Sequence, residues 1–233
     1  NWYIMLRRYD KRNILVMGCT HIPFTQEGYL EHCLKVRKEK KCGTVVHLGD
    51  LVDNLGLTMR DLDPDGHSPN DEILLARKKL KEWFLAFPEL KFTLGNHDLR
   101  LARKAKKGGI PSIAVRKFSE IWKLPDKWEV DLRFVIDGVG YEHGSSTGQN
   151  AHRELAIYNR MPAAQAHSHA FAGVAYTASP KDCIWGLNSG CGIDNSAIAF
   201  AYGKHFKVKP IVSCATVENG KNPQIFKMEL GLQ

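Results

Sequence analysis

The sequence lacks the features that mark several specialised classes of protein. No apolar run approaches the roughly 20 residues that are needed to cross a bilayer, and residues 2–6 are too short an apolar stretch for a signal peptide. None of the six cysteines belongs to a Cys-x-x-Cys pair, which disfavours a zinc ribbon or a thioredoxin motif. We therefore expect a cytoplasmic protein with reduced thiols, no membrane partner and an oligomeric state that the sequence leaves open.

Acidic residues are outnumbered by basic ones. The chain has 33 Lys and Arg residues against 25 Asp and Glu residues, which gives a net charge of +8 and a pI of about 9.2. This balance favours anionic partners such as phosphates or nucleic acid, although a soluble protein with excess lysine would share it. An apolar content of 43% in 233 residues suffices for one sizeable core, and no repeat or linker divides the chain. We expect a single domain over residues 1–233.

The two halves of the chain differ in their predicted secondary structure. Short apolar runs predict buried strands at 13–18, 44–48 and 91–94, and they alternate with helices predicted at 27–40, 71–87 and 99–107. The strand–helix–strand order predicts a right-handed parallel crossover, and residues 110–130 are expected to be helical or loop-like. From Arg133 on, short strands are predicted around one helix at 149–159. These strands are 134–136, 139–143, 171–178, 184–188, 211–217 and 225–228.

Side chains that can bind metals follow several of these predicted strands. Carboxylate, amide, imidazole and thiol donors occur together, and such a mixture suits a pair of divalent ions. Two ions about 3.5–4 Å apart can clamp the attacking and leaving oxygens of a phosphoryl displacement. The sequence thus favours a metal-dependent phosphoesterase. The candidate ligands are Cys19, His21, Asp50, Asn96, His143, His167 and His169.

Several positions in these clusters suit particular tasks. The glycine before Asp50 allows a tight turn and leaves the carboxylate able to bridge two cations, one oxygen to each. Asp53 is placed to orient a ligand or to cap the next turn, and Asn96 offers a neutral amide oxygen. His97 could donate a proton to the leaving oxygen, with Asp98 fixing its orientation. Taken singly, these residues have plainer explanations, such as a surface histidine, a small buried cysteine or a helix cap at Asn96 or Asp98.

The order of the clusters resembles the signature of the calcineurin-like metallophosphoesterases, which reads D-x-H, G-D-x-x-D, G-N-H-D, H-G and G-H-x-H. The resemblance spans residues 19–169, and a looser one, at residues 190–194 and 201–204, is to small phosphoesterases encoded by phages, whose place would be the host cytoplasm. The matching motifs are Cys19-Thr20-His21, Gly49-Asp50-Leu51-Val52-Asp53, Gly95-Asn96-His97-Asp98, His143-Gly144 and Ala166-His167-Ser168-His169.

The family resemblance implies a fold and a mechanism. The fold would be a four-layer α/β/β/α sandwich with two mixed sheets, and the metals would lie at the carboxyl ends of the strands. His97 would be the general acid, and a metal-bridging hydroxide would attack phosphorus in line. One metal would be held by Cys19, His21, Asp50 and His169, and the other by Asp50, Asn96, His143 and His167.

Two positions depart from the family pattern. Ala166 replaces the usual glycine, which is a mild change, whereas Cys19 stands where the family has aspartate. A thiolate binds zinc or iron well and manganese poorly, so the first of the two sites could be zinc- or iron-selective, weak or empty. Cys19 could instead be inert, or an introduced substitution.

Arg100 lies three residues beyond His97 and is expected to contact the phosphate of the substrate. The basic residues that follow, at 103–107, would suit a polyanion if they border the site, and would otherwise be a solvated helix face. The leading hypothesis is a phosphodiesterase, nuclease or phosphomonoesterase, including a protein phosphatase, with manganese, zinc or iron as cofactor. The alternatives are a catalytically impaired metal-binding scaffold of the same fold and a module that only binds nucleic acid.

Overall fold

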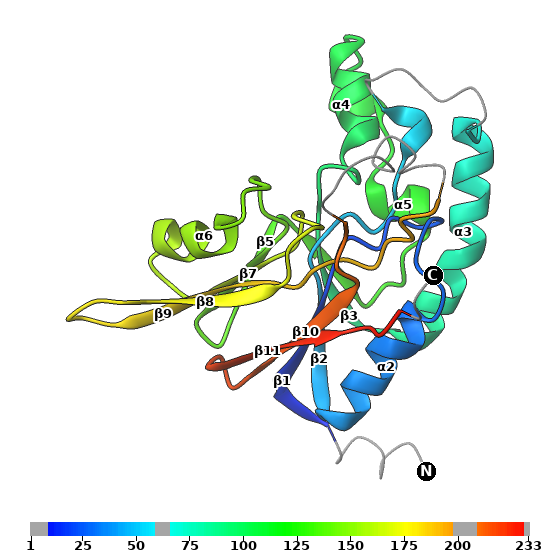
Figure 1. Cartoon of the computed structure of the whole chain (residues 1–233). Coiled ribbons are helices and arrows are strands. Elements are labelled where there is room, and N and C mark those ends of the chain that lie inside the picture. The colour runs from blue at the N-terminus through cyan, green and yellow to red at the C-terminus, as the bar shows by residue number, and fades with distance from the viewer. Residues whose placement is uncertain (1–8, 59–65, 198–208, 231–233) are drawn as a thin grey trace.

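The computed structural model describes residues 9–58, 66–197 and 209–230, whose strands form two sheets (Figure 1). The first sheet has the strand order β11-β10-β1-β2-β3-β4, and the second has the order β5-β6-β7-β9-β8. The first consists of β1 (Asp10–Met17), β2 (Cys42–His47), β3 (Leu90–Thr93), β4 (Trp128–Asp131), β10 (Ser213–Glu218) and β11 (Asn222–Lys227). The second consists of β5 (Arg133–Ile136), β6 (Val139–Glu142), β7 (Ala163–Gln165), β8 (Gly173–Ala178) and β9 (Cys183–Asn188).

Both sheets are mixed. Strands β1 to β4 are parallel to one another, while β10 and β11 complete the first sheet with antiparallel pairs. In the second sheet β6, β7 and β9 are parallel, and β5 and β8 are antiparallel edge strands. The predicted parallel arrangement is confirmed, because β1 and β2 are parallel neighbours on either side of α2 (Tyr29–Glu39), while the handedness of the crossover stays a prediction.

Helices cover the outer faces of the two sheets (Figure 1). Leu15 and Met17 of β1 pack with α2 and with α3 (Pro69–Ala86), and α5 (Phe118–Trp122) joins the same core. Ile14 and Val16 point the other way and pack against residues of the second sheet, such as Tyr141. The outer face of that sheet carries α6 (Ala151–Asn159), where the His152 carbonyl lies directly over Gly186. This alternation along β1 confirms two mixed sheets between helical layers.

Two strands were not predicted. β4 lies in the segment expected to be helical or loop-like, and β7 has three residues, Ala-Ala-Gln. Neither is long enough to show a clear alternation of apolar and polar residues, and each is defined by parallel neighbours far away in sequence. Helix α3 begins two residues before its predicted start, because Ser68 caps it and Pro69 suits the first turn.

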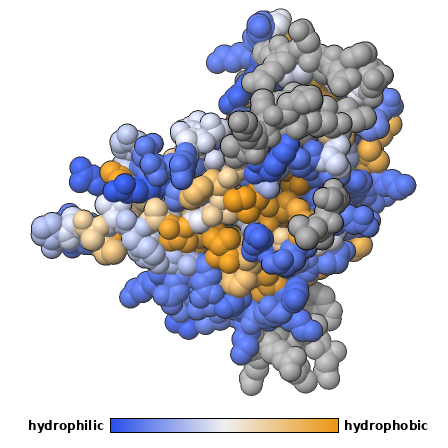
Figure 2. Space-filling model, in the orientation of Figure 1, coloured by the Kyte–Doolittle hydropathy of each residue, from blue (hydrophilic) through white to orange (hydrophobic). Residues whose placement is uncertain are grey.

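The surface is hydrophilic over most of the face in Figure 2, with hydrophobic residues gathered near its middle. No helix among the described residues is both long and apolar enough to cross a membrane. Residues 201–204, which carry part of the resemblance to phage-encoded phosphoesterases, lie outside the described ranges.

The predicted ligand motifs all follow parallel strands. The loops after β1, β2 and β3 leave the first sheet at its carboxyl edge, and those after β6 and β7 leave the second sheet at its own. Hydrogen bonds link neighbouring loops at each edge, and the contact of His143 Nδ1 with the Leu48 carbonyl joins the two edges. The Cys19 N–H donates to the Gly49 carbonyl, and the Ala166 N–H donates to the His143 carbonyl. The fold thereby brings the ligand motifs, which are spread over residues 19–169, to one place.

Candidate metal centre

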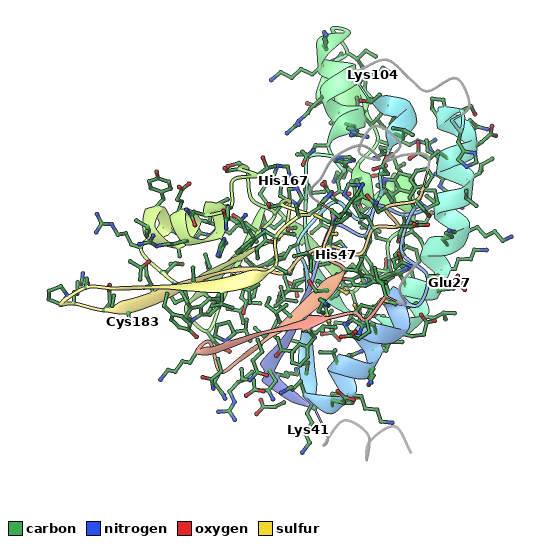
Figure 3. All side chains as sticks on the ribbon, viewed as in Figure 1. Glu27, Lys41, His47, Lys104, His167 and Cys183 are labelled. Atoms are coloured by element: carbon green, nitrogen blue, oxygen red, sulfur yellow. The ribbon has the colours of Figure 1, made fainter. Side chains whose placement is uncertain are left out.

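The structure brings all seven predicted ligands together. Their donor atoms form two groups, and within each group the atoms lie within 4.8 Å of one another. Both groups include Asp50. Asn96 joins the second group, since its Oδ1 lies 3.0 Å from His143 Nε2. Figure 3 labels His167 of this cluster near the base of α4 (Arg100–Lys107). The first group is Cys19, His21, Asp50 and His169, and the second is Asp50, His143 and His167.

His143 faces several acceptor atoms. Its Nδ1 lies 2.7 Å from the Leu48 carbonyl and must donate to it, so Nε2 of the neutral ring carries a lone pair. That lone pair points at Asn96 Oδ1 (3.0 Å), His167 Nδ1 (3.0 Å) and Asp50 Oδ2 (3.2 Å). Ligands of a tetrahedral ion with bonds of about 2.0–2.1 Å lie about 3.3 Å apart. The three distances from His143 Nε2 therefore fit one divalent ion between it and these atoms.

His21 has a similar arrangement in the first group. Its Nδ1 donates to Asp53 Oδ1 at 2.6 Å, which leaves a lone pair on Nε2 of the neutral ring. This Nε2 lies 3.3 Å from His169 Nε2 and 3.6 Å from Asp50 Oδ2. Cys19 Sγ completes the group. The donors again fit one divalent ion, and the Asp53 carboxylate fixes the tautomer of His21.

Asp50 connects the two groups through a single oxygen. Its Oδ2 faces both His21 and His143, whereas Oδ1 accepts the backbone N–H of His97 at 2.8 Å. The contacts favour a single bridging oxygen, because the backbone already uses Oδ1, and the expectation of one oxygen for each cation stays a prediction. Burial would raise the pKa of Asp50, but the surrounding histidines in their protonated forms, His143 above all, hold this pKa well below its usual range. Against the effect of burial, Asp50 in turn raises the pKa of His143, so a bound cation would take the place of the proton on Nε2.

Cys19 is fully buried, and its sulfur accepts the backbone N–H of His167 at 3.2 Å. Burial, and to a smaller extent the Asp50 carboxylate, raise the pKa of the thiol well above its ordinary value. An ionised Cys19 therefore needs a cation beside it, and a bound metal would displace the thiol proton. A thiolate in this donor set fits zinc or iron better than manganese.

The backbone at the centre is held in an uncommon conformation. Cys19, His21, Asp50 and His167 have φ values of +52°, +46°, +51° and +62°, in the left-handed region that non-glycine residues seldom adopt. Such conformations cluster at functional sites. A side chain on Gly95 would collide with the Asp50 carboxylate, so the glycine of this motif is required by close approach.

Asp98 has a different role from the one predicted. Its Oδ2 accepts the backbone N–H groups of Asp50 (2.7 Å) and Gly95 (2.8 Å), so the carboxylate joins two ligand loops and does not orient His97. Burial, followed by the Asp50 charge, raises the pKa of Asp98 to about 7 against these donors. Neither Asp98 nor Asn96 caps the helix that follows, because Leu99 occupies the cap position of α4.

His97 is oriented by Asp53 instead. Its Nδ1 lies 2.8 Å from the Asp53 carbonyl oxygen and 3.1 Å from Oδ1 of the same residue. Burial would lower the pKa of His97, but Asp53 and Asp50 raise it. Arg100 lies on the other side of the ring, with Nη2 3.1 Å from His97 Nε2 and Nη1 donating to the Asp53 carbonyl. Because a guanidinium only donates, Nε2 accepts from Arg100 in this contact, and it can donate a proton only when it is protonated and an acceptor takes the place of the arginine.

A third group of possible ligands consists of His21, Asp53 and His97. The 2.6 Å hydrogen bond between His21 and Asp53 and the contact between Asp53 and His97 account for their proximity. We therefore interpret these contacts as hydrogen bonds that hold the His21 ligand of the first site in position, and not as a third metal site.

Sequence reasoning missed a buried pair behind the ligands. Thr20 Oγ1 donates to the Leu51 carbonyl at 3.0 Å and lies 3.1 Å from His47 Nε2, which must then donate to it. Burial lowers the pKa of His47 to about 3, so the ring is neutral. The pair ties the loop after β1 to the loop after β2. The position of Thr20 between two candidate ligands was a sequence signal for the Thr20–His47 pair. The Leu48 carbonyl that fixes His143 is a main-chain group and has no such signal in the sequence.

The comparisons with known proteins agree with this geometry. A family model described as calcineurin-like phosphoesterase matches residues 12–173, which is more than half of the chain. The chain therefore belongs to the calcineurin-like phosphoesterase family. A search of curated proteins found no match.

Several solved structures are similar to this chain at low identity. Vacuolar protein sorting 29 from Cryptosporidium parvum is 12% identical, with 94% of this chain and 98% of that chain covered and a TM-score of 0.45. The phosphoesterase YfcE from E. coli is 14% identical, with 89% and 88% covered and a TM-score of 0.43. The Pseudomonas putida nuclease MPE is 12% identical, with 94% and 88% covered and a TM-score of 0.41.

Proposed function

We propose that this chain is a metal-dependent phosphoester hydrolase with two divalent ions in its active site. One observation carries the proposal. The ring nitrogens of two histidines from different loops, His21 Nε2 and His143 Nε2, face the same carboxylate oxygen, Asp50 Oδ2. In their neutral forms both nitrogens carry lone pairs, and a cation on each side of that oxygen would stabilise the arrangement. When bound, two such ions can clamp the attacking and leaving oxygens of a phosphoryl transfer.

Each residue then has a defined task. Cys19, His21, Asp50 and His169 would hold one ion, and Asp50, Asn96, His143 and His167 would hold the other. Because manganese binds a thiolate poorly, we propose zinc or iron at the site that contains the cysteine.

His97 would donate a proton from Nε2 to the leaving oxygen of the substrate. The Asp53 carbonyl and carboxylate support the opposite nitrogen of the ring. Arg100 would release His97 and contact the phosphate when a substrate occupies the site. Its guanidinium already lies 3.1 Å from the histidine, so the change is local.

The experiment uses the full chain after chelator treatment, with zinc, manganese or iron added back. We expect hydrolysis of bis-p-nitrophenyl phosphate, of p-nitrophenyl phosphate, or of both, and the ratio of the two rates separates a diesterase from a monoesterase. Failure on both, and on nucleotides and oligonucleotides, would contradict the proposal.

A metal-binding scaffold without catalysis is the second candidate, and Cys19 is the observation that favours it. The sulfur is buried and its thiol pKa is raised, so the first site depends on metal binding to ionise it. Stoichiometric metal without hydrolysis of any substrate in the panel would support the scaffold. The cytoplasmic location, the single domain and the resemblance to phage-encoded phosphoesterases stay predictions.

A further inference from the structure

Helix α4 carries four cations on one face. Arg100, Arg103, Lys104 and Lys107 are spaced i, i+3, i+4 and i+7, which places them side by side along the helix. Ala105, on the opposite side, is buried against the protein. We call the four residues the α4 stripe. Apart from Arg100, its members are exposed and make no side-chain hydrogen bond or ion pair with another residue in the described ranges.

The charges are poorly placed for the stability of the helix itself. Like charges three and four residues apart repel each other, and cations near the N-terminus oppose the helix dipole. The first turn of α4 contains no acidic residue to offset them. Lysines in the last turn are favoured by the dipole, but the two arginines near the start are not. An anionic partner would remove this repulsion.

The α4 stripe begins at the metal centre and leads away from it. Arg100 contacts His97 at 3.1 Å, and Figure 3 shows Lys104 further along the helix that rises above His167. From Arg100 to Lys107 the helix advances about 10 Å at 1.5 Å per residue. One strand of B-DNA presents about three phosphates over that length. A single phosphate group is too small to meet the whole stripe, whereas a phosphodiester chain meets it in sequence.

We propose that the α4 stripe binds the backbone of a nucleic acid strand and guides one of its phosphodiesters to the metal centre. This inference rests on the proposed function, because it takes the phosphodiester beside Arg100 as the one that is cleaved. Arg103, Lys104 and Lys107 would contact neighbouring phosphates that are not cleaved.

The same helix offers a matched control. Lys106 does not belong to the stripe, and together with Lys117 it lines a cavity of about 1000 Å³ beside α4. Arg103 of the stripe reaches the same cavity, whereas Lys104 and Lys107 do not line it. The stripe variant combines Lys104→Gln with Lys107→Gln, and the cavity variant combines Lys106→Gln with Lys117→Gln. Each variant removes two positive charges. All four lysines are exposed, so neither pair of changes disturbs the core.

The test measures binding of the chelator-treated full chain to a fluorescent oligothymidylate by anisotropy over a range of salt concentrations. Without metal the strand is not cleaved. We expect the slope of log affinity against log salt to fall by about 1.4 in the stripe variant, at about 0.7 for each lost phosphate contact on a single strand. The cavity variant should keep the slope of the unmodified chain.

Equal losses in both variants, no loss in either, or binding to phosphatidylserine vesicles without binding to the strand would overturn the inference. The two proposals fail separately. Hydrolysis of small phosphoesters by a chain that does not bind the strand would overturn only the role of the stripe. Stripe-dependent binding by a chain that hydrolyses nothing would support the surface and contradict the enzyme.

Discussion

The prediction that depends most closely on the geometry concerns Asp53. This carboxylate accepts from His21 Nδ1 at 2.6 Å and lies 3.1 Å from His97 Nδ1, but it belongs to neither proposed ligand set. Asp53→Asn keeps an oxygen acceptor and removes the charge that makes His21 a stronger ligand. Loss of such a supporting partner typically lowers metal affinity 10–100-fold, or about 1.4–2.7 kcal/mol. We expect that loss at the first site, while the ion held by Asn96, His143 and His167 keeps its affinity.

Isothermal titration of the metal-free chain with zinc measures both sites. Glu72→Gln is the matched control, because Glu72 is also a buried carboxylate but accepts the backbone N–H groups of Leu55 and Gly56 and not a proposed ligand. It should leave both affinities unchanged. Equal weakening of both sites in the Asp53 variant, or the same weakening in the Glu72 variant, would refute the reasoning.

Three further predictions follow from the site. His97→Ala should lower turnover about 100-fold or more with the metal content intact, and a variant that loses metal would show that His97 is a ligand. Cys19→Asp should raise manganese-supported activity relative to zinc-supported activity, and an unchanged ratio would argue against thiolate ligation. Because burial lowers the pKa of His47 to about 3 while the unfolded ring titrates near 6.5, its contribution to stability is present above pH 6.5. That contribution is lost as the pH falls toward 3, by roughly 1.4 kcal/mol per unit. Urea unfolding of the metal-free chain should show this loss, and His47→Gln should make it shallower; identical pH profiles would contradict the assignment.

The proximity of the candidate ligands was predictable because they follow parallel strands, whereas their division into two sets was implied by the family resemblance and stays a prediction. Parallel strands release their carboxyl-terminal loops at one edge, so a donor after β1 and another after β2 must lie close together. The same logic failed for β4 and β7, which are too short to be recognised from their own residues.

Residue roles were harder to predict than residue positions. Asp98 is next to His97 in the sequence, yet its carboxylate turns to backbone N–H groups, and Asp53 takes its expected place. The path of the backbone decides both contacts. The Leu48 carbonyl, which sets the tautomer of His143, is a main-chain group that any residue could supply. A sequence pattern identifies side-chain chemistry and carries little information on such partners.

The metal-to-protein ratio tests the central claim most directly. The full chain is loaded with zinc and freed of excess metal, and its mass is then measured by native mass spectrometry. The account predicts two zinc ions per chain, because Asp50 Oδ2 faces two separate sets of donors. A chain that retains no ion, or only one, would contradict it.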